Sequence, residues 1–165
     1  MKYNWGILTA GKMSAKFVKA LKLLENAELY SVGARHQGRA DHFATEFGFR
    51  KSYSSYDELV SDPEVDIIYI ASPHSHHFEH TMLCLKNRKA VLCEKAFSLN
   101  SREVQVMIDE SRKQGVFLME ALWPPFQPIY RKTREVMQNG EAGKLIHLDA
   151  RFGFQPPYDP IDRKY

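Results

Sequence analysis

Short apolar runs alternate with segments of helical periodicity along most of this chain, and no other feature restricts its fold as strongly. The runs have the length of buried strands, and the segments between them repeat apolar residues every three or four positions. Strands separated by helices of about ten residues predict right-handed βαβ crossovers and an α/β fold with a doubly wound, mostly parallel sheet. The expected strands are residues 3–9, 27–34, 51–53, 67–71, 90–94 and 116–119.

The expected helices have local start and stop signals. Ser55 with Glu58 has the spacing of a capping box, Asn100 with Glu103 opens a later helix, and Gly115 ends that helix. The apolar faces that mark the helices are Phe17, Val18, Leu21 and Leu24; residues 40–47; Tyr56, Leu59 and Val60; Phe78, Met82 and Leu85; and Val104, Met107 and Ile108.

The pattern changes near Pro124, which divides the chain into an α/β domain over residues 1–122 and the truncated start of an α+β second domain over residues 123–165. The second part predicts a helix over 129–137 and a strand over 146–154, followed by a proline-rich tail. A half-apolar strand with no later partner is a candidate for self-association. We therefore expect it to pair with another chain or with a longer second domain.

Composition excludes several classes of protein. A chain of 165 residues with 44% hydrophobic and 26% charged residues is expected to be globular, without a disulfide or metal to hold it together. The net charge of +3 comes from scattered basic residues, which gives little support for a nucleic-acid partner. We find no apolar run of about 18 residues and no signal peptide, and we expect a cytoplasmic protein without a membrane partner. Cys84 and Cys93 lack CxxC spacing and are typical of buried free thiols.

The run VLCEKAFSLN places Glu94 and Lys95 directly after an apolar strand. Open α/β sheets bind ligands in the crevice outside the carboxyl ends of their strands, so Lys95 is the first candidate for chemistry. The alternative is a lysine that extends to solvent from a strand end, with Glu94 as its surface partner. Cys93 as a nucleophile is a weaker alternative, because no base is paired with it by spacing.

The turn after the first strand predicts a dinucleotide site, although it is poor in glycine. The usual fingerprint has glycines near positions 9, 11 and 14, and only Gly11 is present. Ser14 is small enough for close packing, and Thr9 must make the tight turn without the conformational freedom of glycine. A strand that leads into a helix still presents backbone N–H groups and a positive dipole end to a pyrophosphate.

Arg35 stands after the second strand, where an acidic residue would bind the ribose hydroxyls of NAD. A guanidinium at this point accommodates a 2′-phosphate, and His36 and Arg39 follow it. These residues favour NADP over NAD as the cofactor. The alternative is a solvated arginine at a strand end.

Four histidines, His74, His76, His77 and His80, lie within seven residues, and His76 and His80 have the i, i+4 spacing of some metal sites. No cysteine lies among them, and Glu79 between them points elsewhere on a helix. We prefer a loop and helix start beside the cofactor, and we expect no metal.

Five motifs in order, GILTAGKMS, GAR, ASPHSHH, VLCEKAFSLN and MEALWPPF, resemble the glucose-fructose oxidoreductase, inositol dehydrogenase and MocA family. The resemblance is greatest to the dimeric dihydrodiol dehydrogenase branch. It covers residues 3 to about 128 and implies an NAD(P)-binding Rossmann domain. It also implies hydride transfer between the nicotinamide and a carbon that bears a hydroxyl, in a sugar, an inositol or a trans-dihydrodiol.

The resemblance also implies roles for individual residues. Lys95 would contact the nicotinamide ribose and the reacting oxygen, where an ammonium stabilises a developing alkoxide or supplies its proton. Lys95 is thus the expected catalytic residue, and the expected substrate is a small alcohol or ketone. The expected assembly is a homodimer. The expected cofactor residues are Gly6, Thr9, Ala10, Gly11, Lys12, Met13, Arg35, Ser72, Pro73, His77, Glu94, Lys95 and Trp123.

The chain departs from the family pattern at three points. Ala96 replaces the proline that follows the lysine, and Pro125 stands where the branch usually has an arginine. Trp123 and Phe126 are suitable as walls for a ring-bearing substrate, or pack without further function. The family's second domain carries an Asp and a His or Tyr that complete the catalytic site, and we expect these to lie beyond this chain. The alternative function is a non-catalytic nucleotide-binding or self-associating module, or an inactive fragment.

Overall fold

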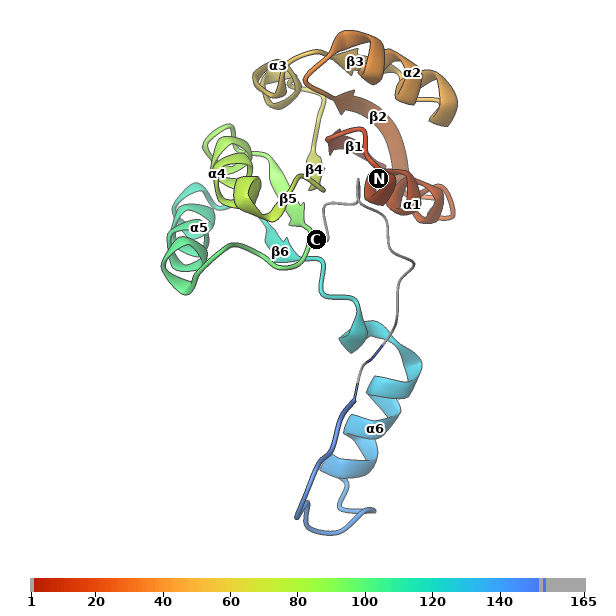
Figure 1. Ribbon diagram of the computed structural model, residues 1–165, viewed down its shortest axis with the longest axis vertical. Coiled ribbons are helices and arrows are strands. Elements are labelled where there is room, and N and C mark those ends of the chain that lie inside the picture. The colour runs from red at the N-terminus through yellow and green to blue at the C-terminus, as the bar shows by residue number, and fades with distance from the viewer. Residues whose placement is uncertain (1, 152, 154–165) are drawn as a thin grey trace. The chain divides into compact units, whose positions relative to one another are not determined.

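The computed structural model describes residues 2–151 and 153, and its first unit, Met1–Leu122, contains a six-stranded parallel sheet (Figure 1). The strands are β1 (Tyr3–Leu8), β2 (Ala27–Gly33), β3 (Lys51–Tyr53), β4 (Ile67–Ile70), β5 (Ala90–Cys93) and β6 (Leu118–Glu120). The helices of this unit are α1 (Lys12–Leu21), α2 (Gln37–Phe47), α3 (Tyr56–Ser61), α4 (His77–Lys86) and α5 (Ser101–Gln114), with a 3-10 turn at His74–His76.

The strand order is β3-β2-β1-β4-β5-β6, and all five pairings are parallel. The chain therefore winds outward from β1 in one direction and, after β3, returns to continue from β4 in the other. This is the doubly wound arrangement expected from the sequence, and it places the topological switch between β1 and β4. All carboxyl ends of the strands lie at one edge of the sheet.

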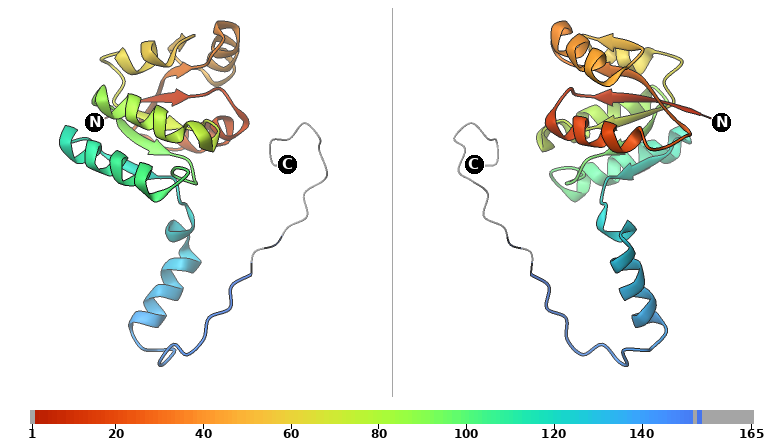
Figure 2. Two further views of the ribbon diagram at one scale, coloured as in Figure 1. Left: turned by 60° about the vertical axis from the view of Figure 1, so that its left-hand side comes forward. Right: turned by 90° about the vertical axis from the view of Figure 1, so that its right-hand side faces the viewer.

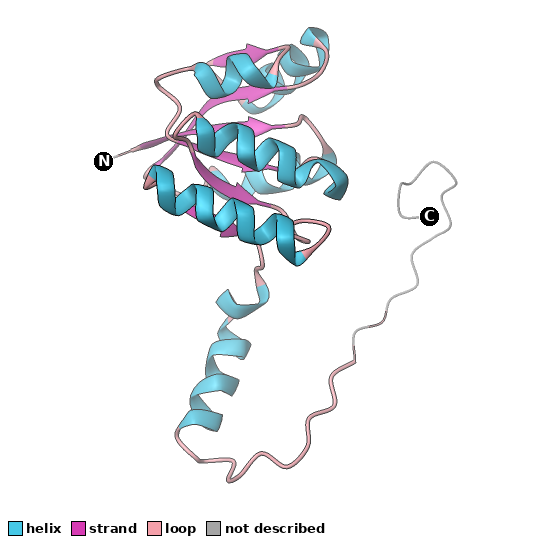
Figure 3. Cartoon of the chain, turned by 90° about the vertical axis from the view of Figure 1, so that its left-hand side faces the viewer, coloured by secondary structure: helices cyan, strands magenta, loops and turns pink. Residues whose placement is uncertain are grey.

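Helices cover both faces of the sheet. Helices α1 and α2 pack on one face, where Val18, Phe43 and Phe47 contact the β1 and β2 side chains Ile7 and Val32 in one core cluster. Helices α3, α4 and α5 lie in front of the other face (Figures 2 and 3), where a second cluster joins α3 and α4 to the strands. Burial on both faces explains why the strands consist of nearly continuous apolar residues.

Local end signals are confirmed in part. The Asn100 side chain accepts a bond from the backbone N–H of Glu103 at 3.0 Å, and Gly115 ends α5 in the left-handed conformation, as expected. Ser55 also caps its helix, but it accepts from Asp57 N at 3.1 Å, so the reciprocal box with Glu58 is not the geometry that forms.

Some expected boundaries are wrong. Strand β1 ends at Leu8, because Thr9 has φ 89° and cannot continue a strand. Helix α1 ends at Leu21, so Leu24 lies in an exposed turn and not on the helix face. The last strand is shifted and runs to Glu120.

The second unit, Trp123–Tyr165, contains a 3-10 turn at Pro124–Phe126 and helix α6 (Pro128–Gln138), which confirms the expected helix. The expected strand over 146–154 does not form in its described part, residues 146–151 and 153, and its remaining residues lie outside the described ones. Alternation of apolar and polar residues makes a strand only where a partner supplies ladder hydrogen bonds. None of the described helices is long and apolar enough to cross a membrane.

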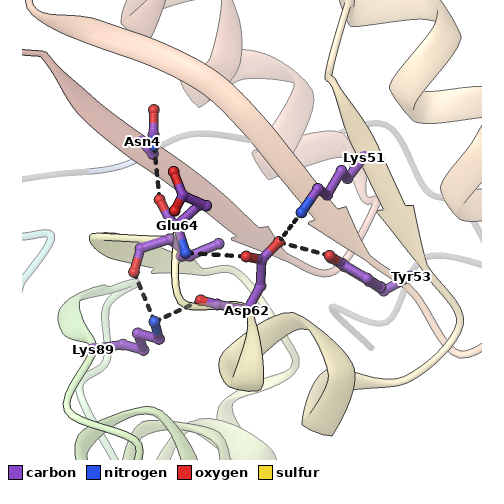
Figure 4. Close-up of polar contacts among 7 residues, drawn as sticks. Asn4, Lys51, Tyr53, Asp62, Glu64 and Lys89 are labelled. Atoms are coloured by element: carbon purple, nitrogen blue, oxygen red, sulfur yellow. Dashed lines mark hydrogen bonds and ion pairs between the residues drawn. The ribbon is translucent and has the colours of Figure 1, made fainter.

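A buried residue, Asp62, joins β3 to the chain segments that precede β4 and β5 (Figure 4). Asp62 accepts bonds from Lys51 Nζ at 2.8 Å, from the Tyr53 hydroxyl at 2.6 Å and from Glu64 N at 3.0 Å. Lys89 Nζ donates to the Asp62 carbonyl oxygen at 2.6 Å. This network holds α3 against the sheet.

Candidate active site

Hydrogen bonds join the turns after β1 and β5 to the carboxyl ends of β2 and β4 at one edge of the sheet. Thr9 N donates to the carbonyl oxygen of Gly33 at 3.1 Å, and the Thr9 hydroxyl donates to that of Ala71 at 2.9 Å. Glu94 N donates to the carbonyl oxygen of Ile70 at 2.9 Å. The structure thus brings most of the expected site residues together at the switch point.

The turn after β1 has a positive φ at Thr9, a conformation that a glycine would adopt at lower cost. One hydrogen bond from the Thr9 side chain and one from its backbone N–H offset that strain. Gly11 precedes α1 and has no side chain to cap it, while Lys12 and Met13 are exposed in the first turn. The N–H groups at this helix start are therefore open to an anionic group. Ala10 lies buried between Thr9 and Gly11.

Gly6 is not part of this turn. It lies within β1, and a Cβ there would lie 3.1 Å from Val65 Cγ1 and 3.2 Å from Ile68 Cγ1. The same Cβ would lie 3.3 Å from Leu59 Cδ1 of α3. Gly6 therefore allows close packing under α3, and its expected contact with the cofactor is corrected.

Arg35 is exposed and lines a recess of about 310 Å³ beside the α3 and α4 helix starts. The other lining residues are Ser54, Ser55, Tyr56, Asp57, Glu79, His80 and Leu83. Burial raises the pKa of Tyr56, and the nearby charges of Arg35 and Arg39 act against that rise. Arg39 Nε donates to the carbonyl oxygen of Ala10 at 3.1 Å, so both arginines belong to the same edge.

His80 is buried against this recess, a role that its sequence position did not indicate. Its Nδ1 lies 2.9 Å from the Ser72 hydroxyl, and its ring contacts Tyr56 edge-on at 4.9 Å. Burial lowers the pKa of His80 to about 4. The imidazole is therefore neutral at neutral pH and gives this wall of the recess no positive charge.

The depressed pKa of His80 predicts a loss of stability in mild acid. The unfolded chain binds a proton near pH 6.5 that the folded chain resists until about pH 4, so unfolding becomes easier as the pH falls through this window. When the pH is lowered from 7 to 5, the unfolding free energy of the native chain is expected to fall by about 2 kcal/mol more than that of His80→Asn. Urea unfolding at the two pH values measures this, with the exposed His42→Asn as control. Parallel pH profiles for the native chain and His80→Asn would contradict the prediction.

His77 is also buried, and both of its ring nitrogens are used within the protein. Nδ1 lies 2.7 Å from the carbonyl oxygen of Ala96, and Nε2 lies 2.9 Å from that of Ser72. The side chain therefore joins the loops after β4 and β5 and is not open to a cofactor, which corrects the expected direct contact. Pro73 remains exposed beside it.

Glu94 is not a surface partner of Lys95. Its Oε1 accepts a bond from the Tyr69 hydroxyl at 2.6 Å, and its Oε2 accepts from the backbone N–H of Lys95 at 3.2 Å. Lys95 itself is exposed, and among the described residues its ammonium forms no ion pair. The Lys95–Ala96 peptide bond is cis.

The other end of this turn is held from β6, where Glu120 Oε1 accepts from Phe97 N at 2.9 Å. Trp123 opens the second unit, where its carbonyl oxygen accepts from Phe126 N at 3.0 Å and its side chain is exposed.

Burial raises the pKa of Cys93 to about 12, so a thiolate nucleophile at this position is disfavoured.

The histidines pair with each other and do not converge on one point. The rings of His76 and His80 stack at 5.6 Å, and those of His74 and His77 meet edge-on at 5.3 Å. Within residues 2–151 and 153, no group of three or more His, Cys, Asp or Glu side chains is placed to hold a metal ion.

Comparison with known proteins gives consistent matches. Residues 3–122 match the model of the oxidoreductase family with an NAD-binding Rossmann fold. The chain is 43% identical over 162 residues to trans-1,2-dihydrobenzene-1,2-diol dehydrogenase of Mus musculus, covering 97% of this chain and 49% of that protein. The Homo sapiens protein of the same name is 41% identical over 155 residues, covering 93% and 46%.

The fold has close counterparts among solved structures. An NAD-binding oxidoreductase from Klebsiella pneumoniae superposes with a TM-score of 0.81 at 28% identity, over 87% of this chain and 40% of that one. The chain thus spans about half the length of the curated relatives that it matches.

Proposed function

The chain belongs to the oxidoreductase family with an NAD-binding Rossmann fold, and we propose that it supplies the cofactor-binding part of an NADP-dependent oxidoreductase. The observation that carries the proposal is that an uncapped helix start, Arg35 and Lys95 follow β1, β2 and β5, whose carboxyl ends lie at one edge of the parallel sheet. These three features suit a pyrophosphate, a 2′-phosphate and a reacting oxygen in turn.

Each of these residues has a separate task. The backbone N–H groups after Gly11 bind the pyrophosphate, and Arg35 pairs with the 2′-phosphate at the mouth of its recess. A nicotinamide cofactor held by these residues would supply the hydride chemistry, as donor in reduction and as acceptor in oxidation. In carbonyl reduction the Lys95 ammonium would hold the substrate oxygen and donate a proton to it as negative charge develops there. In alcohol oxidation the neutral Lys95 amine would accept the hydroxyl proton as the hydride leaves the carbon.

We propose that the substrate carries a CH–OH group, or is the corresponding ketone. The relatives' names indicate a trans-dihydrodiol, and the alternatives are a sugar and an inositol. The mouse and human relatives are named for trans-1,2-dihydrobenzene-1,2-diol. Because the chain spans about half of their length, the substrate contacts beyond Lys95 are assigned to the part that those relatives have in addition. A dimer and a cytoplasmic location stay predictions from the sequence.

The experiment that tests the cofactor site is a fluorescence titration of the chain with NADPH and, in parallel, with NADH. We expect micromolar binding that favours NADPH. Binding of neither nucleotide by a folded chain would contradict the proposal and favour a module that has lost nucleotide binding.

Replacing Arg35 with aspartate is expected to weaken NADPH binding by about 1.5 to 3 kcal/mol, because a charge-assisted bond to the 2′-phosphate is lost. NADH lacks that phosphate, so its affinity changes much less. The two dissociation constants, measured by the same titration, report the difference. The control is Arg112→Asp in the last turn of α5, which makes the same charge change at an exposed site. Equal losses for the two nucleotides would remove Arg35 from the phosphate site.

A further inference from the structure

Tyr69 connects two parts of the site that the sequence does not link. It lies on β4 with 1% of its surface exposed, and its ring stacks on Phe17 of α1 at 3.8 Å between centroids and 13° between planes. Its hydroxyl donates to Oε1 of Glu94, the residue that directly follows β5, at 2.6 Å. One side chain therefore contacts both the helix that follows the nucleotide turn and the turn that carries Lys95.

The hydroxyl is held as a donor. Burial, and then the bond to Glu94, raise the pKa of Tyr69, so the phenol stays protonated throughout the usual working range. The second Glu94 oxygen accepts from the backbone N–H of Lys95 at 3.2 Å. Glu94 is thus fixed on one side by Tyr69 and itself fixes the main chain of Lys95 on the other.

Two further contacts hold the turn beyond Lys95 but do not hold Lys95 itself. His77 contacts the carbonyl oxygen of Ala96, and Glu120 accepts from Phe97 N. The carboxylate of Glu94 is the side-chain acceptor found for the N–H of Lys95 among the described residues. The start of the turn therefore depends on Glu94, and the orientation of Glu94 depends on Tyr69.

We propose that Tyr69 is a positioning residue for Lys95. Tyr69 acts through the Glu94 carboxylate and aligns the Lys95 turn with the α1 side of the cofactor site. The proposal rests on the proposed function only for the chemical role of Lys95. The Tyr69 ring has a packing role, because it stacks on Phe17. The Tyr69 hydroxyl has the positioning role, which it exerts through Glu94 alone.

The test is Tyr69→Phe, which keeps the ring and its stack and removes the hydroxyl. We expect the backbone amide of Lys95 to exchange with solvent about tenfold faster in NMR exchange measurements, since the acceptor of its bond is no longer fixed. Amides of β4 and α1 are expected to keep their rates. The matched control is Tyr53→Phe, which removes another 2.6 Å bond from a tyrosine to a carboxylate, Asp62, at a distant network, and which leaves the Lys95 amide unchanged.

A double variant shows whether Tyr69 acts through Glu94. Glu94→Gln still accepts from Tyr69 with its amide oxygen, but its amide nitrogen cannot accept from Lys95 N. In that background Tyr69→Phe is expected to add less than about twofold to the exchange rate of Lys95. A tenfold effect that persists in the Gln background, or no effect of Tyr69→Phe on Lys95, would overturn the proposal.

The NADPH titration keeps this result separate from the proposed function. Tyr69→Phe is expected to leave NADPH affinity within about twofold, because Tyr69 acts on Lys95 and not on the phosphates. A chain that binds no nucleotide but shows the exchange changes would retain the positioning role and lose the proposed function. Weaker NADPH binding with unchanged exchange at Lys95 would show that Tyr69 supports α1 alone, against the proposal.

Discussion

Replacing Lys95 with methionine is expected to lower kcat for oxidation of a trans-dihydrodiol by about a thousandfold and to leave NADPH binding within about threefold. Methionine keeps an unbranched apolar stem and removes the ammonium. The loss falls on the chemical step because the charge on the substrate oxygen develops only there. The phosphate contacts are made by other residues, so the cofactor still binds.

The rate is measured on a chimera that joins residues 1–122 to the remaining part of the mouse relative, with NADP and trans-1,2-dihydrobenzene-1,2-diol. The control is Lys113→Met, an exposed lysine in the last turn of α5. A kcat within tenfold of the native chimera would remove Lys95 from the chemistry. An equal loss for Lys113→Met would show that the effect is not specific to the site.

Replacing Asp62 with alanine is expected to lower the unfolding free energy by about 3 to 5 kcal/mol, because a buried partner of several donors is removed. The hydroxyl of Tyr53 and the N–H of Glu64 lose their acceptor, and Lys51 loses its ion pair (Figure 4). Burial acts to raise the pKa of Asp62, but the bonds from Lys51 and Tyr53 outweigh it and hold the pKa below its ordinary value. The stabilisation is therefore present above about pH 4 and is lost in stronger acid.

Urea unfolding at pH 7 gives the measurement, with Lys51→Met as the comparison. Lys51 has 43% of its side chain exposed, so its loss is expected to cost less than about 1 kcal/mol. Equal losses for Asp62→Ala and Lys51→Met would mean that the ion pair, and not the whole network, carries the stability.

The fold was predictable because its signals are local. The continuous apolar run that became β4 and the helix end signals at Asn100 and Gly115 depend on residues close in sequence. The positions of Arg35 and Lys95 follow from the fold, since parallel strands bring their carboxyl ends to one edge. The strand expected over 146–154 depended instead on a partner strand, and alternation alone does not supply one.

The sequence by itself determined the doubly wound sheet, its order of elements and the edge to which the proposed site residues belong. Only the tertiary structure decided what each side chain near that edge contacts. Gly6 packs under α3, His77 joins two loops, and Tyr69 reaches Glu94 from another strand. The physical reason is range: periodicity and caps act over a few residues, whereas these contacts join residues that only the βαβ crossovers bring together.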